Sequence, residues 1–497
     1  MVRILLYYAF ICFKGFFTVC KKGSRPVEKF GEIISTVDGY LWGPWFLILL
    51  VGTHVFMTFR TGFIQRKILT AIKLSFKKDE GEGDISQFGA LTTALASTIG
   101  TGNIVGVGTA VMLGGPGAVL WMWLTGVFGI ATKYAECLIA VKYRVKDGKG
   151  MMLGGAMYAL ERGLKQRWLG IIFAVFAMFA SFGIGSGVQA NATASILSSN
   201  LHVPNWVTGA ALVILIGLIL IGGLKRIANV CERFVPFMAV VYVIGCLVLL
   251  VMNYKYLGAA VVSIVTDAFS LKAMGGGFAA ATLMSAMRYG VARGLFSNES
   301  GMGSAPIVAA AARTKNPVRQ ALVSATGTFW DTVIICALTG LVLVSTIEKF
   351  GLTPADIPDG SNITTIAFGQ LGIIGVIILV FGIITFASST ILGWSYYGDR
   401  CAEYLFGPKA VLPYRIVYIA FAFIGACVSL NIVWDAADAL NALMTIPNII
   451  AVILLHNVIG KETKLYIGKE NLNLTDETPI PLKEDLRKMR AKKKNAE

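Results

Sequence analysis

The strongest constraint on the fold is a series of long, nearly uncharged apolar runs that recurs from residue 41 to residue 459. Each run is close to the roughly 20 residues that cross a bilayer as a helix. Backbone N–H and C=O groups find no water inside lipid, so only helices or a closed barrel can span it. Because the runs are continuous and do not alternate with a period of two, they are not barrel strands. The sequence therefore predicts an all-α membrane protein.

The composition excludes several other classes of protein. Only 14% of the 497 residues are charged, against about 25% in soluble domains. The net charge of +16 comes from basic residues in short loops, which the positive-inside rule explains without nucleic acid. The eight cysteines and three histidines show no metal-ligand or disulfide spacing. We find no catalytic constellation either, so we expect neither an enzyme nor a cofactor.

The apolar runs predict about eleven membrane-spanning helices. Their approximate bounds are 41–59, 87–113, 118–141, 168–197, 206–223, 234–252, 277–312, 320–346, 366–397, 414–433 and 436–459.

Loop charges predict how these helices are oriented in the cell membrane. Lysine and arginine gather in every second loop, whereas 114–117 and 198–205 carry none. The positive-inside rule then places the N-terminus outside and the C-terminus in the cytoplasm. Residues 61–84 have apolar residues at helical spacing between basic ones, which is typical of an amphipathic helix on the cytoplasmic lipid surface.

Two spans share an unusual glycine-interrupted pattern. Residues 90–111 read ALTTALASTIGTGNIVGVGTAV, and residues 289–310 read YGVARGLFSNESGMGSAPIVAA. Each opens a block of five spans, and the predicted topology inverts one block relative to the other. Inverted repeats with matching interrupted helices point to the binding site of a secondary transporter.

The repeat divides the chain into six predicted parts. They are a peripheral extension (1–37), an extra transmembrane helix (38–60), the amphipathic segment (61–84), the first five-helix repeat (85–253), the second five-helix repeat (254–460) and a charged cytoplasmic tail (461–497).

Broken helices supply binding groups that an intact helix lacks. Clustered glycines weaken a helix, each by roughly 1 kcal/mol relative to alanine, and we expect Gly100 and Gly102 to break the first one. The freed amides at a half-helix N-terminus suit a carboxylate, and the freed carbonyls are oxygen ligands for sodium. For Gly106 and Gly108 we expect close helix packing instead.

Two carboxylates lie inside predicted spans, where a charge is costly and is a functional candidate by default. Glu299 can hold a substrate ammonium, join a cation relay or pair with Arg293. Asp331 can serve a cation in the same way, or balance Arg288 or Arg293.

Other polar residues inside the spans are candidates for the same site. Gln189 can bind substrate or only neighbouring helices. A run of three hydroxyls, 388–390, faces the predicted break and suggests sodium ligands. Trp394 lies one turn further on and can wall a small pocket.

At this point the chain resembles the alanine or glycine:cation symporter family. The resemblance rests on LWGPW from Leu41, GDISQFGALTTALASTIGTGNIVGV from Gly83, GGAMYALERGL from Gly154 and GLFSNESGMGSAP from Gly294. It covers about residues 38–460. It implies a LeuT-type five-plus-five inverted repeat with one extra N-terminal helix, which agrees with about eleven spans.

The resemblance also implies roles for individual residues. The backbone at Thr101 and Gly102 would receive the substrate carboxylate. A sodium ion would lie between carbonyl oxygens of the first break and hydroxyls of the ninth span, and a second sodium position would adjoin the first break. The implied residues are Ala96, Ile99, Ser389 and Thr390 for the first ion, Thr98 and Asn103 for the second, and Phe296, Met302 and Trp394 for the pocket wall.

Together these observations predict a symporter that couples inward sodium flow to uptake of alanine or glycine by alternating access. The predicted partners are the amino acid, sodium as cosubstrate and membrane lipid, and the sequence does not predict an oligomeric state. One alternative is a proton-coupled transporter of the same fold that uses Glu299 or Asp331. A second, from another class, is an ion channel.

Overall fold

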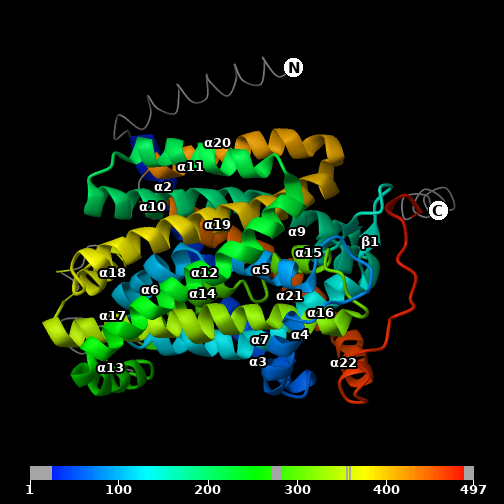
Figure 1. Cartoon of the computed structure of the whole chain (residues 1–497), viewed down its shortest axis with the longest axis horizontal. Coiled ribbons are helices and arrows are strands. Elements are labelled where there is room, and N and C mark those ends of the chain that lie inside the picture. The colour runs from blue at the N-terminus through cyan, green and yellow to red at the C-terminus, as the bar shows by residue number, and fades with distance from the viewer. Residues whose placement is uncertain (1–24, 271–282, 354–355, 357–359, 429, 486–497) are drawn as a thin grey trace.

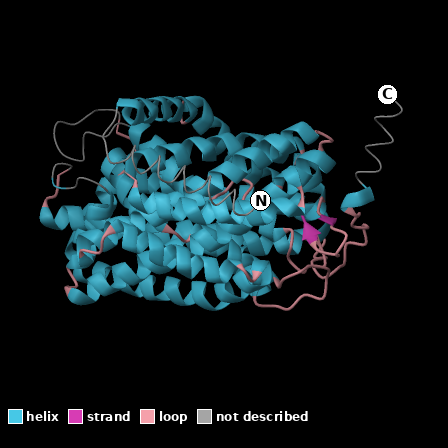
Figure 2. Ribbon diagram, turned by 90° about the horizontal axis from the view of Figure 1, so that it is seen from above, coloured by secondary structure: helices cyan, strands magenta, loops and turns pink. Residues whose placement is uncertain are grey.

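The computed structural model describes residues 25–270, 283–353, 356, 360–428 and 430–485. Helices make up almost all of it, and Figure 2 shows the two short strands at one end of the molecule. The antiparallel strands β1 (Val145–Lys146) and β2 (Met152–Leu153) form a small hairpin between two helices. The predicted all-α membrane class is confirmed.

The chain enters the fold through two helices joined at a bend. Helix α2 (Arg25–Leu41) and helix α3 (Pro44–Arg60) meet at 48°, because Pro44 is favoured at the first turn of a new helix. The boundary expected at residue 37 therefore lies within α2. The segment expected on the membrane surface contains η1 (Ile64–Lys67) and α4 (Ile68–Ser75), in which Leu69 is exposed.

The first repeat begins with a broken helix and continues with four further long helical runs. Ser86 caps the first half by accepting a hydrogen bond from the Gly89 N–H. The broken helix consists of α5 (Gln87–Thr98), η2 (Gly102–Gly106) and α6 (Val107–Gly114). Helix α7 (Ala118–Lys142) follows, and the connection after it contains α8 (Ala156–Tyr158) and η3 (Ala159–Gly163). The last elements are the continuous run α9 (Arg167–Ala180), η4 (Ser181–Gly187) and α10 (Val188–Leu201), and the helices α11 (Asn205–Leu220) and α12 (Gly223–Met252).

The second repeat follows the same order, with short helices added before, between and after its spans. Asn316 and Pro317 start its second span, as an N-cap and a first-turn proline. The elements are α13 (Tyr254–Asp267), α14 (Leu283–Asn298), α15 (Ala305–Ala309), the run α16 (Pro317–Thr328), η6 (Phe329–Cys336) and α17 (Ala337–Phe350), then α18 (Gly360–Gly369), α19 (Ile373–Phe406), η8 (Pro408–Ala410), α20 (Val411–Cys427), α21 (Leu430–Leu454) and α22 (His456–Tyr466).

The two broken helices run in opposite directions through the molecule. The segment before α5 pairs with the segment after α15, through the bridges Glu82 to Thr314 and Ile85 to Ala312. The start of one broken helix therefore meets the end of the other at what we call the basic end, which carries β1, β2, α4 and α22 (Figure 1). The predicted inversion is confirmed.

The number of spans is only partly fixed. Within the described residues, seven helices are long and apolar enough to cross a membrane, and two bent pairs raise the number to nine. The predicted eleven stays a prediction.

The charged tail packs against the basic end, where Figure 1 shows it running from α22 toward β1. Asp476 pairs with Lys142 at 2.8 Å, and Asn316 donates hydrogen bonds to the carbonyls of Leu472 and Leu474. The last residues, 486–497, lie outside the described part.

Candidate functional site

The first break lies between α5 and η2, and the two halves of this helix meet at 50°. Ile99 leaves the helix with ψ of 88°. The freed N–H of Gly100 donates to Asn103 Oδ1 at 2.9 Å, and that of Thr101 donates to Gln189 Oε1 at 3.0 Å. The predicted break at Gly100 and Gly102 is confirmed, and side-chain amides satisfy two of its backbone groups.

Glycine is required at position 100 for a steric reason. A Cβ there would lie 2.4 Å from Thr390 Oγ1 and 3.0 Å from Gln189 Oε1. At Gly108 a Cβ would lie 2.2 Å from the Gly360 carbonyl oxygen, which confirms close helix packing. At Gly106 the nearest atom would be 3.9 Å away, so the packing role expected there is wrong.

The second break separates α14 from α15 by the residues 299–304. Glu299, Gly301 and Gly303 have φ values of 56°, 94° and 79°. Glycine adopts such left-handed conformations readily, whereas a glutamate there is uncommon. The glycine-interrupted pattern thus predicts this break correctly, while Glu299 adds backbone strain that no spacing rule reveals.

A group of oxygen atoms joins the first break to α19. Thr390 Oγ1 donates to the carbonyl of Ala96 at 3.0 Å and lies 3.5 Å from that of Ile99. The neighbouring Ser389 Oγ donates to Phe386 O in its own helix at 2.9 Å. Three of the four residues implied as ligands of the first sodium ion therefore meet, and Ser389 is adjacent to them.

A second polar group links both breaks through η6. Asn103 Nδ2 donates to Asp331 Oδ1 at 2.7 Å, and Ser297 Oγ donates to Asp331 Oδ2 at 2.8 Å. Thr98 was expected beside Asn103, but its hydroxyl donates to carbonyls of its own helix, Ala94 and Leu95. Sequence reasoning missed Ser297, although its place two residues before Glu299 could have pointed to it.

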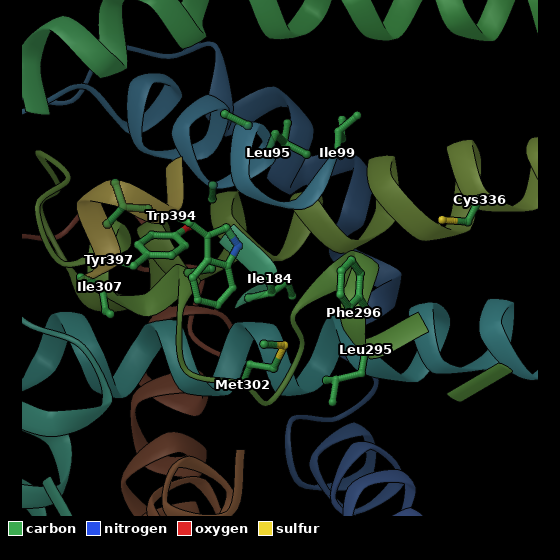
Figure 3. Packing of buried hydrophobic residues seen from close by; sticks show 14 of the residues in the cluster. Leu95, Ile99, Ile184, Leu295, Phe296, Met302, Ile307, Cys336, Trp394 and Tyr397 are labelled. Carbon is green, nitrogen blue, oxygen red and sulfur yellow. The ribbon is translucent and has the colours of Figure 1, made fainter. Parts of the chain in front are cut away.

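The residues expected to wall the pocket are all buried. Figure 3 shows Phe296, Met302 and Trp394 within one cluster of buried hydrophobic residues. Phe296 packs against the first break, since a Cβ on Gly102 would lie 3.1 Å from its ring. Trp394 packs against Gly185 of η4, where a Cβ would overlap it.

In the part of the chain that the structure describes, neither intramembrane carboxylate pairs with an arginine. Arg293 makes a bidentate ion pair with Asp438, at 2.6 and 3.2 Å, and Arg288 lies 3.4 Å from Asp38. The alternatives that paired Glu299 or Asp331 with these arginines are therefore wrong. The sequence did not reveal this because Asp38 and Asp438 lie 250 and 145 residues from the arginines they meet.

Glu299 has one carboxylate oxygen bound and one free. Its Oε2 accepts a hydrogen bond from Ser304 Oγ at 2.5 Å, and its Oε1 is buried without a partner in the described part of the chain. Thr101 Oγ1, at the other break, is likewise buried and unpartnered among these residues. Buried polar atoms without a partner are rare in proteins, so both atoms are candidates for contacting a ligand.

A charged pair on α7 was missed entirely. Lys133 and Glu136 lie 3.3 Å apart, and their side chains are 2% and 0% exposed. The sequence signal that could have revealed this pair is two opposite charges, three residues apart, inside the apolar run 118–141.

Both ends of the site are closed by protein. At the opposite end from the basic one, the Arg293 guanidinium stacks on Trp434 at 4.6 Å, and Trp434 stacks on Phe296 at 4.8 Å. At the basic end, Arg144 donates to the carbonyls of Ala310, Ala312 and Glu82. Burial lowers the pKa of Arg144 to about 10, so its guanidinium stays charged at neutral pH.

Comparison with known proteins shows which family this chain belongs to. A model of the sodium:alanine symporter family matches residues 27–479. An uncharacterized transporter of Haemophilus influenzae is 50% identical over 90% of this chain and 99% of its own length. The sodium/alanine symporter AgcS of Methanococcus maripaludis is 49% identical over 88% of this chain and 97% of its own length.

Among solved structures, MhsT in complex with L-phenylalanine shares the fold. The TM-score is 0.54 at 16% identity, over 80% of this chain and 94% of that one. This likeness shows the LeuT-type fold alone.

Two glycines of the first break provide a matched test of the packing. We expect Gly100→Ala to lower the melting temperature of the purified protein markedly, because its Cβ displaces Thr390; overpacking of this kind costs about 1–3 kcal/mol. Gly106→Ala is the control, since the Cβ has room. Equal melting temperatures for the two variants would contradict the packing described.

Proposed function

The chain belongs to the sodium:alanine symporter family, and from this premise we propose that it couples inward sodium flow to uptake of alanine or glycine by alternating access. The single observation that carries the proposal is the meeting of two broken helices around buried carboxylates that, among the described residues, make no ion pair with a cationic side chain. Family and fold are those of transporters, not of enzymes.

Charge balance supports a cationic guest at this centre. Glu299 and Asp331 are fully buried and make no ion pair within the described residues. A buried carboxylate without a counter-charge is costly. The nearby Lys133 already forms an ion pair with Glu136, so a sodium ion beside Asp331 and a substrate ammonium beside Glu299 would balance the remaining negative charge.

The first break is suited to the substrate carboxylate. The Thr101 N–H points at Gln189 Oε1, so a carboxylate can replace this amide oxygen on the same donor. We therefore propose that Gln189 releases Thr101 when the amino acid binds at Thr101 and Gly102. The unpartnered Thr101 hydroxyl offers a further donor beside this amide.

The first sodium position is supported by oxygen atoms that already converge. The carbonyls of Ala96 and Ile99 approach Thr390 Oγ1 from another helix, and Ser389 Oγ is its neighbour in the chain. Sodium in this position would tie the first broken helix to α19. The second position takes Asn103 Oδ1, Asp331 and Thr98, whose hydroxyl donates its hydrogen to carbonyls of its own helix and keeps its lone pairs for the ion.

The contacts that close the two ends of the site suit the gates that alternating access requires. We place the basic end in the cytoplasm, by the positive-inside rule. The inner gate is then the pairing of 82–85 with 312–314 under Arg144, and the outer gate is the Arg293–Asp438 pair over Trp434 and Phe296. Each sodium ion moving inward across 100 mV contributes about 2.3 kcal/mol to uptake.

Transport by the purified protein tests the proposal. In proteoliposomes, an inward sodium gradient should drive uptake of radiolabelled alanine, and unlabelled alanine or glycine should compete better than leucine or glutamine. Uptake driven by a proton gradient without sodium would favour the proton-coupled alternative. Currents far above the turnover of a carrier would favour a channel.

The first sodium position makes a sharper prediction. The double variant Ser389→Ala, Thr390→Ala should lose sodium-dependent alanine binding while the protein stays folded, because two ligand oxygens are removed. Thr385→Ala is the matched control: its hydroxyl bonds only to its own helix, at Phe381 and Gly382. Wild-type sodium dependence in the double variant would refute the assignment.

Pocket size is tested at Trp394. Replacing this buried indole by leucine should admit amino acids larger than alanine, because space opens beside Gly185. Trp330→Leu serves as the control, since this tryptophan is 37% exposed. If competition profiles of wild type and Trp394→Leu coincide, Trp394 does not limit substrate size.

A further inference from the structure

The buried ion pair on α7 takes no part in the binding roles proposed above. Lys133 and Glu136 are one helical turn apart and face the second break. Placing two charges inside a membrane protein is expensive, and such a pair repays its desolvation only when further hydrogen bonds satisfy it. Its partners therefore indicate what it does.

Glu136 holds the start of the second half-helix. Its Oε2 accepts hydrogen bonds from the N–H groups of Gly301 and Gly303, at 3.2 and 3.1 Å. Asn448 of α21 completes this cradle, because its Nδ2 donates to Glu136 Oε2 at 2.7 Å and to Gly301 O at 2.8 Å. These donors have left the helix and would otherwise be unsatisfied.

Lys133 holds the end of the first half-helix. Its Nζ donates to the backbone carbonyl of Glu299 at 2.9 Å. This carbonyl follows the last residue of α14, a 16-residue helix, so a positive charge here also opposes the negative end of the helix dipole. The pair thus places a cation at freed carbonyls and an anion at freed amides.

Glu299 is the residue whose orientation this arrangement decides. Its φ of 56° is a left-handed conformation that a glutamate keeps only when its surroundings hold it there. The backbone carbonyl accepts hydrogen bonds from Lys133 Nζ on α7, at 2.9 Å, and from the Met302 N–H, at 3.2 Å, whereas the carboxylate binds Ser304 through Oε2. Losing the Lys133 contact would let this backbone relax and turn the carboxylate away.

The other side of the break is supported by the extra helix. The ring of His54, on α3, lies 3.8 Å from where a Cβ on Gly301 would be, and His54 Nδ1 forms a hydrogen bond with Thr132 Oγ1 at 2.8 Å. This contact packs the extra helix against the second break.

We propose that Lys133 and Glu136 are positioning residues that act as one clamp: they hold residues 299–303 in the bent form and thereby keep the Glu299 carboxylate in place for the substrate ammonium. The role of the Glu299 carboxylate in binding a substrate ammonium rests on the proposed function. The clamp that holds residues 299–303 does not.

The test compares Lys133→Met, Lys133→Arg, Glu136→Gln and the double variant Lys133→Met, Glu136→Gln. Lys142→Met is the matched control on the same helix, because Lys142 pairs with residues at the basic end. Melting temperature, sodium half-saturation without alanine, and the alanine Kd of the folded fraction are measured for each.

The clamp predicts a specific combination of results. Lys133→Met should raise the alanine Kd by about tenfold or more while sodium half-saturation stays within about twofold, and Lys133→Arg should recover most of the affinity. The melting-temperature loss of the double variant should be smaller than the sum of the two single losses, because removing both charges leaves none unpaired. Lys142→Met should change neither ligand measurement.

Two outcomes would overturn the proposal. One is wild-type alanine affinity in folded Lys133→Met. If Lys133→Met fails to fold, wild-type alanine affinity in folded Glu136→Gln overturns it in the same way. The other is strictly additive melting-temperature losses. If the wild-type protein binds no alanine, the proposed function fails by itself, and the melting-temperature comparison still decides whether the clamp exists.

Discussion

The rest of the structure depends on one constraint: a backbone N–H or C=O group inside lipid must find a partner, because no water is there to supply one. Two helices of this chain stop halfway and free such groups, at 99–103 and at 299–303. Most neighbouring features of the molecule follow from how these groups are satisfied. The side chains that bond to them come from α7, α10, α19 and α21, so helices of both repeats converge on the two breaks.

The two breaks are satisfied by different chemistry, and this difference suits different tasks. Neutral groups, from Gln189, Asn103 and Thr390, bond to the first break. A hydrogen bond between neutral groups contributes only about 1 kcal/mol net, so a carboxylate or a sodium ion can take its place. Charged groups hold the second break, through Lys133 and Glu136, and removing one partner of a buried ion pair costs about 3–5 kcal/mol. We therefore see the first break as the part that exchanges partners during transport and the second as the part that stays fixed.

The sequence predicted what depends on local pattern. The membrane class follows from the apolar runs, and both breaks follow from clustered glycines in spans of opposite direction. The approach of Thr390 to Ala96 and Ile99 follows from the family resemblance.

The sequence could not predict which distant side chain meets a given charge. Pairing of Arg293 with Glu299 or Asp331 was one of the alternatives that the sequence left open, yet Arg293 pairs with Asp438. Gln189 was expected to contact the guest, and the structure shows it on the amide that the guest would need. Such choices depend on how helices pack, which neither spacing nor composition encodes.

The most direct measurement of the central claim is an experimental structure of the purified protein in sodium and alanine, compared with one in potassium without alanine. The account predicts an amino acid whose carboxylate lies on the Thr101 N–H and whose ammonium lies at Glu299, with Gln189 moved off Thr101 and an ion among Ala96, Ile99 and Thr390. An unchanged Gln189 to Thr101 bond, with alanine bound elsewhere or not at all, would contradict it.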